Sequence, residues 1–170
     1  YALNRDPVSE KHQKRLTRMD GAVNNITRLV EDLVTMSNLD GMTQLDYAPV
    51  QINQIINQVV SGLEDSISNK ELSVELALSE NLPLFSADEL YLNLALKNIV
   101  GNAVRYTSPN DKIVLRTTIE EQVIIIEVSD TGIGLNDEQK QHIFERFYRG
   151  NAAHTTRGFG LGLPIAQKII

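Results

Sequence analysis

The stretch VIIIEVSDTGIG, residues 123–134, runs from a predicted strand into a glycine-rich turn through a single acidic residue. The apolar, β-branched run at residues 123–128 is typical of a strand. Asp130 follows this run, and Gly132 and Gly134 keep side chains away from the nearby backbone. An aspartate at such a strand end can accept a hydrogen bond from the exocyclic amine of adenine. The alternative is a plain glycine turn, since a five-residue match of this kind often occurs by chance.

Outward from this stretch the hydrophobic pattern predicts a mixed α and β domain. Residues 113–118 pair with residues 123–128 around Glu120–Glu121, and residues 72–78 alternate as a strand with one buried face. Residues 45–50 form a short edge-strand candidate, limited by Pro49. Helical spacing is found at residues 52–63 and 88–105, the second with apolar positions Leu90, Leu94, Ala95, Ile99 and Val100.

The helix at residues 88–105 carries two amides on one face. Asn98 and Asn102 are four residues apart, and Arg105 and Tyr106 follow one turn later on the same side. A carboxamide oxygen is a neutral ligand for Mg²⁺, an arginine can meet a phosphate, and a tyrosine can lie against a base. The alternative is that both asparagines merely cap the helix end or lie in solvent.

A second glycine cluster, residues 158–163, reads Gly-Phe-Gly-Leu-Gly-Leu and leads into an apolar run. Glycines let backbone N–H groups approach phosphate oxygens, and a following helix aims its positive end at them. The cluster lacks the Gly-Lys-Ser/Thr of a Walker loop and opens no βαβ unit. The alternative is a flexible linker, which Leu161 and Leu163 argue against.

Between the glycine clusters, residues 144–149 read Phe-Glu-Arg-Phe-Tyr-Arg. The small, polar residues 150–157 follow, so the pattern predicts an aromatic hinge that holds a mobile flap over the site. Arg149 or Arg157 could reach a terminal phosphate. The alternative is a surface helix end with solvated arginines.

The N-terminal segment keeps a seven-residue apolar register that forms one stripe of a helix. This narrow stripe fits a partner helix, although an ordinary amphipathic helix packed on its own domain is equally compatible. Turn-forming residues 38–41 are expected to end the helix. The stripe comprises Leu16, Met19, Val23, Ile26, Val30 and Leu33.

Composition excludes several classes of protein. The chain has 170 residues and a net charge of −6, which argues against nucleic-acid binding. It contains no cysteine, so disulfides and thiolate metal sites are excluded. It shows no signal peptide and no apolar run approaching the ~18 residues that span a bilayer, and a cytoplasmic setting is expected. Both ends look cut, because the chain starts without Met and stops inside an apolar run.

In their order and spacing, the asparagine helix, Asp-x-Gly-x-Gly, Phe-Glu-Arg-Phe-Tyr-Arg and Gly-x-Gly-Leu-Gly-Leu resemble the N, G1, F and G2 boxes of the sensor histidine kinases of two-component systems. The match runs roughly from Leu45 to Ile170; each motif is weak alone, and the set is specific. The resemblance implies an α/β (α+β) sandwich of the histidine-kinase/gyrase/Hsp90-type ATPase class, with a mixed sheet covered on one face by helices.

The resemblance also implies ATP and Mg²⁺ as ligands and transfer of the terminal phosphate to a histidine, for relay to an aspartate of a response regulator. Asn98 and Asn102 would hold Mg²⁺ and the phosphates, and Asp130 would recognise adenine. Asn98, Arg105 and Arg149 would serve the phosphate transfer. The further nucleotide contacts would be Arg105, Tyr106, Gly132, Gly134, Gly158, Gly160, Leu161, Gly162 and Leu163.

By the same resemblance, residues 1–41 are part of a dimerisation and phosphoacceptor stem, and residues 42–170 are a catalytic ATP-binding domain that stops early. The stem resembles the second helix of a hairpin that forms a four-helix bundle in a homodimer. The family's acceptor motif, a histidine followed by an acidic residue, is absent, since Gln13 follows His12 and both His142 and His154 lie beside the glycine clusters. The acceptor is therefore expected upstream of Tyr1, where a membrane anchor is also compatible with the resemblance.

Two other functions stay open from the sequence. A related ATP hydrolase or serine kinase would place a glutamate at Asn98, and a carboxamide cannot take a proton near neutral pH. Losing a general base typically costs ~10²–10⁴ in rate, which favours slow hydrolysis and transfer to an imidazole. A non-catalytic adenine-nucleotide sensor or dimerisation module is the second alternative.

Overall fold

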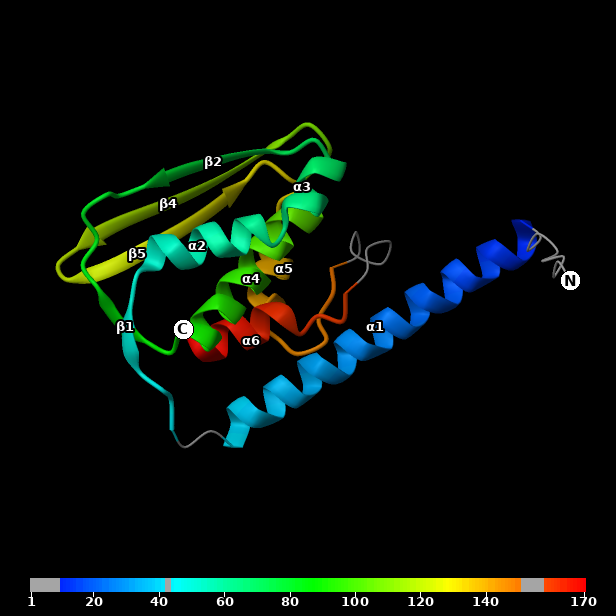
Figure 1. Cartoon of the computed structure of the whole chain (residues 1–170), viewed down its shortest axis with the longest axis horizontal. Helices are drawn as coiled ribbons and strands as arrows, with labels where there is room; N and C mark the ends of the chain where they lie inside the picture. Colours follow the sequence, from blue (N-terminus) through cyan, green and yellow to red (C-terminus); the bar gives the residue numbers. More distant parts are fainter. Residues whose placement is uncertain (1–9, 42–43, 151–157) are drawn as a thin grey trace, which may run out of the picture.

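The computed structural model describes residues 10–41, 44–150 and 158–170. Its elements mix helices and strands, as the hydrophobic pattern predicts, and Figure 1 shows their arrangement. They are α1 (Glu10–Gly41), β1 (Ala48–Val50), α2 (Ile52–Ser61), α3 (Glu64–Asn69), β2 (Ser73–Leu78), β3 (Phe85–Ala87), α4 (Glu89–Tyr106), β4 (Lys112–Glu120), β5 (Val123–Asp130), α5 (Asp137–His142) and α6 (Gly162–Ile169).

The main sheet is mixed, with the strand order β2-β4-β5. β2 and β4 are parallel, whereas β4 and β5 form an antiparallel hairpin with Glu120 opposite Val123. Glu121 and Gln122 turn the hairpin with φ of 46° and 74°, the left-handed conformation that a two-residue turn favours. β1 and β3 pair separately as a small antiparallel ribbon.

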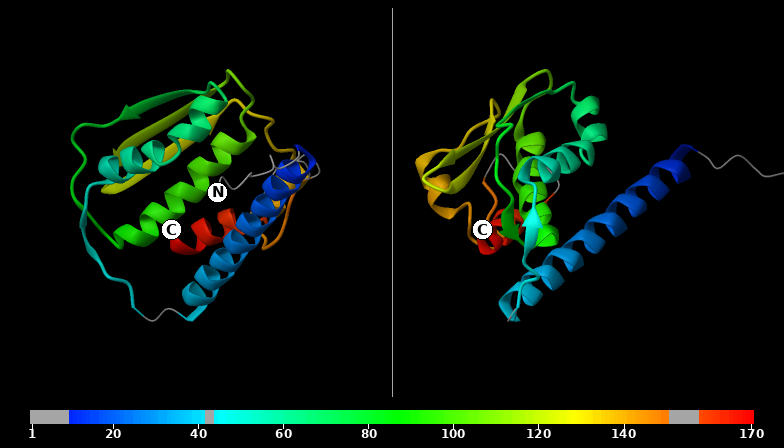
Figure 2. Two further views of the ribbon diagram at one scale, coloured as in Figure 1. Left: turned by 45° about the vertical axis from the view of Figure 1, so that its right-hand side comes forward. Right: turned by 60° about the vertical axis from the view of Figure 1, so that its left-hand side comes forward.

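Helices cover one face of the main sheet. Figure 1 shows α2 and α4 side by side against this face, and the views in Figure 2 agree. Asp88 begins α4 by accepting hydrogen bonds from the backbone N–H groups of Leu90 and Tyr91. The expected sandwich is therefore confirmed, with a core centred on Ile55, Ile56, Leu96, Val100, Ile113 and Leu115.

α1 lies on the helix side of the domain, away from the main sheet (Figure 2). Its C-terminal turns bury Met36 and Leu39 against Leu161 and Ile165, which lie at the start of α6 and within it. None of the helices in the described ranges is long and apolar enough to cross a membrane.

α1 ends at Gly41, within the predicted residues 38–41. Three expectations about local structure are wrong in detail. The predicted edge strand at residues 45–50 shrinks to the three residues of β1, and the hairpin turns at Glu121 and Gln122 rather than at Glu120 and Glu121. Leu90 was placed on the apolar side of its helix, yet it is 82% exposed. It lies in the first turn of α4, where the N-cap residue fixes the backbone and the side chain reaches no core residue.

Candidate functional site

A cavity of about 360 Å³ lies between α4, the loop after β5, and the start of α6. This volume falls in the range of small-molecule sites. The structure brings together at this cavity every predicted site residue except Gly132. The residues placed there are Asn98, Asn102, Arg105, Tyr106, Asp130, Gly134, Arg149, Gly158, Gly160, Leu161, Gly162 and Leu163.

One face of α4 forms a wall of the cavity. Asn98, Asn102 and Arg105 repeat at helical spacing, so their side chains project to the same side. Arg105 Nη1 donates to Asn102 Oδ1 at 3.4 Å, a weak bond that a ligand can replace. Asn98 Nδ2 is buried and has no hydrogen-bond partner among the residues that the structure describes. A buried donor without a partner is costly, and a ligand oxygen in the cavity would satisfy it.

Asp130 ends β5 and faces the same cavity. Its Oδ1 accepts a hydrogen bond from the backbone N–H of Gly132 at 2.9 Å, which fixes the orientation of the carboxylate. Its Oδ2 takes no part in this hydrogen bond. Gly132 does not line the cavity, because its backbone packs on the end of α4. A Cβ at this position would lie 2.5 Å from the carbonyl oxygen of Tyr106.

The second glycine cluster forms the opposite wall, and each of its glycines lies close to a neighbouring group. A Cβ on Gly158 would lie 2.7 Å from Arg105 Nη1, and one on Gly162 would lie 2.9 Å from Asn98 Oδ1. Gly160 has φ of +72°, and a Cβ there would lie 2.5 Å from the carbonyl oxygen of Tyr148. α6 begins at Gly162, so its positive end lies at the cavity.

The rim near α5 combines Tyr148, Arg149 and Gly150. An Asn136–Gln139 capping box begins α5, and Gln139 also lines the cavity. The predicted flap beyond residue 150, with its His154 and Arg157, lies outside the described residues. The mobility predicted for the flap therefore stays a prediction.

Sequence reasoning missed the contribution of α1. Asn25, Arg28 and Asp32 line the cavity from α1. Burial, followed by repulsion from Glu31, raises the pKa of Asp32, while Arg105 and Arg28 oppose the rise. The spacing of three and four residues places all three side chains on one helix face, which is a visible signal, but nothing in the sequence indicates that this face meets the cavity.

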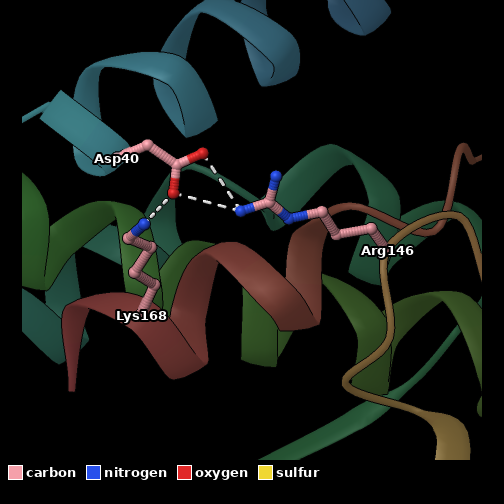
Figure 3. Close-up of polar contacts among 3 residues, drawn as sticks. All are labelled: Asp40, Arg146 and Lys168. Atoms are coloured by element: carbon pink, nitrogen blue, oxygen red, sulfur yellow. Dashed lines mark hydrogen bonds and ion pairs between the residues drawn. The ribbon is translucent and has the colours of Figure 1, made fainter.

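An ion-pair cluster holds the end of α1 beside the site (Figure 3). Asp40 lies between Lys168 of α6 and Arg146, whose Nη2 is 3.1 Å from both carboxylate oxygens. The hydrogen bond from Lys168 is the main reason that the pKa of Asp40 lies below its usual range. The hydrogen bond from Arg146 lowers this pKa further. The cluster thus joins the end of α1 to the segment that follows α5 and to the helix that follows the second glycine cluster.

The oxygen donors on α4 fit a hard cation better than a transition metal. Within the described ranges, no group of three or more His, Asp or Glu side chains could hold a metal ion. The carboxamides of Asn98 and Asn102 lie on the cavity wall, and Mg²⁺ requires few protein oxygens when phosphates and waters supply the others.

Comparison with known proteins identifies the domain that surrounds this cavity. Residues 87–170 match the family described as histidine kinase-, DNA gyrase B-, and HSP90-like ATPase. The chain is 32% identical over 160 residues to the sensor protein kinase PmrB of Pseudomonas aeruginosa, covering 94% of this chain and 33% of that protein. The chain thus spans about a third of this curated relative.

Solved structures share the fold over nearly the whole chain. Full-length ShkA in complex with AMPPNP superimposes with a TM-score of 0.80 at 27% identity, covering 98% of this chain and 35% of that one. The histidine kinase ThkA in complex with the response regulator protein TrrA gives a TM-score of 0.68 at 19% identity, covering 99% of this chain and 46% of that one. The second likeness concerns the fold alone.

Proposed function

Because this chain belongs to the sensor histidine kinases and carries their ATPase domain, we propose that it binds ATP in the cavity beside α4 and transfers the terminal phosphate to a histidine. The acceptor histidine would lie on a dimerisation helix outside this chain. The observation that carries the proposal is the convergence of the asparagine face, Asp130 and the second glycine cluster on one cavity. AMPPNP, an ATP analogue, is bound in the related ShkA structure.

The two ends of the cavity suit the two ends of the nucleotide. At one end Asp130 accepts from the adenine amine, and Tyr106 lies against the base. At the other end the start of α6 and the glycine cluster supply backbone N–H groups for the phosphates, and Arg105 and Arg149 supply positive charge. Asn98 and Asn102 would hold Mg²⁺ through their carboxamide oxygens, and the bound cation would neutralise part of the phosphate charge.

Phosphotransfer is favoured over hydrolysis by the chemistry of α4. Asn98 occupies the position where a general base would activate water, and its amide cannot accept a proton near neutral pH. This favours transfer to an imidazole, which is itself a nucleophile. The same proposal includes two further predictions. Residues 150–157 would form a mobile flap over the bound nucleotide, and Arg149 would contact its terminal phosphate.

Residues 1–41 are proposed to form part of a dimerisation stem, namely the second helix of its hairpin, and residues 42–170 to form the catalytic ATP-binding domain. The stripe on α1 is exposed in the single chain, with its six side chains between 43% and 63% accessible. A second copy would cover this stripe in a helical bundle. A response regulator is the proposed downstream partner, as the similarity to sensor protein kinases implies.

The test supplies the chain with Mg²⁺, γ-labelled ATP and a separate helical hairpin that carries a histidine followed by an acidic residue. Acid-labile label is expected on the hairpin and none on His12, His142 or His154 of this chain. His12 is followed by Gln13 rather than an acidic residue, and His142 is held by Glu145 at 2.7 Å. A hairpin with the acceptor histidine replaced by glutamine is the control.

Other outcomes would identify the alternatives. Stoichiometric label on the chain alone, lost in His12→Gln, would show that the acceptor has been misplaced. Rapid release of free phosphate without the hairpin would indicate an ATP hydrolase. Nucleotide binding with neither transfer nor hydrolysis would indicate a non-catalytic sensor.

A further inference from the structure

Lys70 belongs to none of the motifs described above. All three N–H donors of its ammonium group bond to carbonyl oxygens at the C-terminal end of α4, the helix that forms a wall of the cavity. It follows α3, and its Nζ donates to the carbonyl oxygens of Val104 at 2.8 Å, Arg105 at 2.7 Å and Thr107 at 3.0 Å. An ammonium group has three N–H donors, so these bonds use its full capacity. Lys70 itself does not line the cavity.

The last turn of α4 is tied down on its other sides as well. The hydroxyl of Thr107 donates to the carbonyl of Ala103 at 2.6 Å, and the N–H of Ile133 donates to the carbonyl of Tyr106 at 3.4 Å. The second bond connects the turn to the loop after Asp130. One helix end therefore joins three parts of the cavity: Arg105, Tyr106 and the first glycine cluster.

This arrangement solves an electrostatic problem for an anionic ligand. The C-terminal end of a helix carries a partial negative charge, and α4 ends at residues that line the cavity. Unshielded carbonyl groups at this end would offset part of the positive charge that Arg105 presents to the phosphates. The positive charge of Lys70 offsets the partial negative charge of these carbonyl groups. Because Lys70 does not line the cavity, it takes no space from a ligand.

Lys70 brings a charge, and not only hydrogen-bond donors, to the end of α4. Burial, followed by repulsion from the Arg105 guanidinium, lowers the pKa of Lys70. A neutral donor could satisfy a carbonyl at the end of a helix without this repulsion. A cation placed behind a second cation adds positive potential where Arg105 meets the cavity.

We propose that Lys70 is a positioning residue for the phosphates of the bound nucleotide. It fixes the last turn of α4, from which Arg105 and Tyr106 reach the cavity, and it offsets the negative end of that helix. The inference rests on the proposed nucleotide function and adds a residue that touches neither the nucleotide nor the reacting atoms.

A structural cap and a positioning residue differ in what they do to the ligand's phosphates. Lys70→Met keeps the length of the side chain and removes the donors and the charge. We expect affinity for ADP to fall about tenfold or more, by analogy with the ~10–100-fold losses seen when the residues that orient metal ligands are changed. Affinity for adenosine should fall much less, so the ratio of the two affinities changes. Lys70→Arg, which keeps the charge and several donors, should restore most of the ratio.

The measurement is a titration of each variant with ADP and with adenosine, followed by NMR shifts of the cavity residues. Lys112→Met is the matched control, since it removes one lysine charge from a surface ion pair with Glu75 outside the cavity. Thermal unfolding of each variant reports its folding. If Lys70→Met does not fold, Lys70→Gln carries the same comparison with one amide left to donate.

Two results would overturn the inference. Equal losses of ADP and adenosine affinity would reduce Lys70 to a structural cap, and unchanged affinities would remove its role altogether. If the unmodified chain binds neither ADP nor ATP, the proposed function itself fails, and this outcome is separate because it involves no variant.

Discussion

At the scale of single residues, the site combines a fixed carboxylate with glycines that leave no room for side chains. Asp130 already holds the turn through Gly132, so its orientation does not depend on a ligand. Gly160 adopts φ of +72°, and a Cβ added at this position would lie 2.5 Å from the carbonyl oxygen of Tyr148. These residues therefore separate into those whose chemistry serves a ligand and those whose absence of a side chain shapes the wall.

Asp130→Asn should weaken ATP and ADP binding while leaving the fold intact. The amide oxygen can still accept from Gly132, but the negative acceptor for the adenine amine is lost. Hydrogen bonds to charged groups contribute about 1.5–3 kcal/mol, so a loss of roughly tenfold or more is expected. Calorimetry measures the affinities, with the exposed Asp65→Asn as control. The unmodified chain should prefer ATP over GTP, since the carboxylate repels the guanine carbonyl. Equal ATP affinity in Asp130→Asn and the unmodified chain would remove the adenine-reading role.

Two glycine-to-alanine changes should have opposite effects on stability. Gly160→Ala forces an L side chain into a left-handed conformation, which costs about 1–2 kcal/mol before the contact with Tyr148 is counted. Gly101 lies inside α4, and a Cβ there meets nothing within 4 Å. Gly101→Ala should therefore stabilise the chain by roughly 0.5–1 kcal/mol. Thermal unfolding measures both, and a higher melting temperature for Gly160→Ala would contradict the strained conformation.

At the scale of elements, α1 meets the rest of the chain near its C-terminal end. The apolar contact buries Met36 and Leu39, and the Asp40 cluster with Arg146 and Lys168 closes it (Figure 3). Arg146 lies in the segment that follows α5, and Lys168 lies on the helix that begins at the second glycine cluster. The ion pairs therefore connect α1 to two segments that contribute other residues to the cavity wall.

Asp40→Asn should loosen the end of α1 without unfolding the domain. The carboxylate is exposed and its pKa is lowered, chiefly by the hydrogen bond from Lys168. A group with a lowered pKa contributes stability above its unfolded pKa and loses it as the pH falls through the folded value. Docking of α1 should thus be constant from neutral pH down to about pH 4 and weaken below it. NMR shifts of the Leu39 methyl groups follow the docking, and Asp20→Asn on the same helix is the control. An unchanged acid transition in Asp40→Asn would assign the effect to another group.

At the scale of the whole molecule, α1 has one face that contacts the rest of the chain and one apolar face that is exposed. One face carries Asn25, Arg28 and Asp32 to the cavity and Met36 and Leu39 to α6. The other carries the apolar stripe from Leu16 to Leu33, which stays exposed in the single chain. Apolar exposure along a long helix is unfavourable in water, so this second face is the one expected to pair between copies.

Ile26→Asp should convert the proposed dimer to a monomer. Ile26 lies in the middle of the stripe and is 62% exposed, so the change costs the single chain little. In a paired stem it would bury a carboxylate against a second apolar stripe. Sedimentation measures the mass, and Asn24→Asp adds the same charge off the stripe. ADP affinity should stay unchanged, since Ile26 does not line the cavity. A monomer in the unmodified chain at all concentrations would remove the dimer proposal.

The sequence alone determined the features that depend on local spacing. The Asn98–Tyr106 face, the hairpin formed by residues 113–128 and the glycine clusters follow from helical and strand periodicity and from turn chemistry, which neighbouring residues set. Their order along the chain was enough to indicate the family. It also indicated most of the cavity, because each motif occupies the end of one element.

Only the tertiary structure decided which distant residues complete the site. Lys70 reaches the end of α4 across 34 to 37 positions, and Lys168 reaches Asp40 across 128. The docking face of α1 and the exposed Leu90 depend in the same way on what packs nearby. No local pattern records such contacts, because the free energy that selects them comes from burying whole elements against one another.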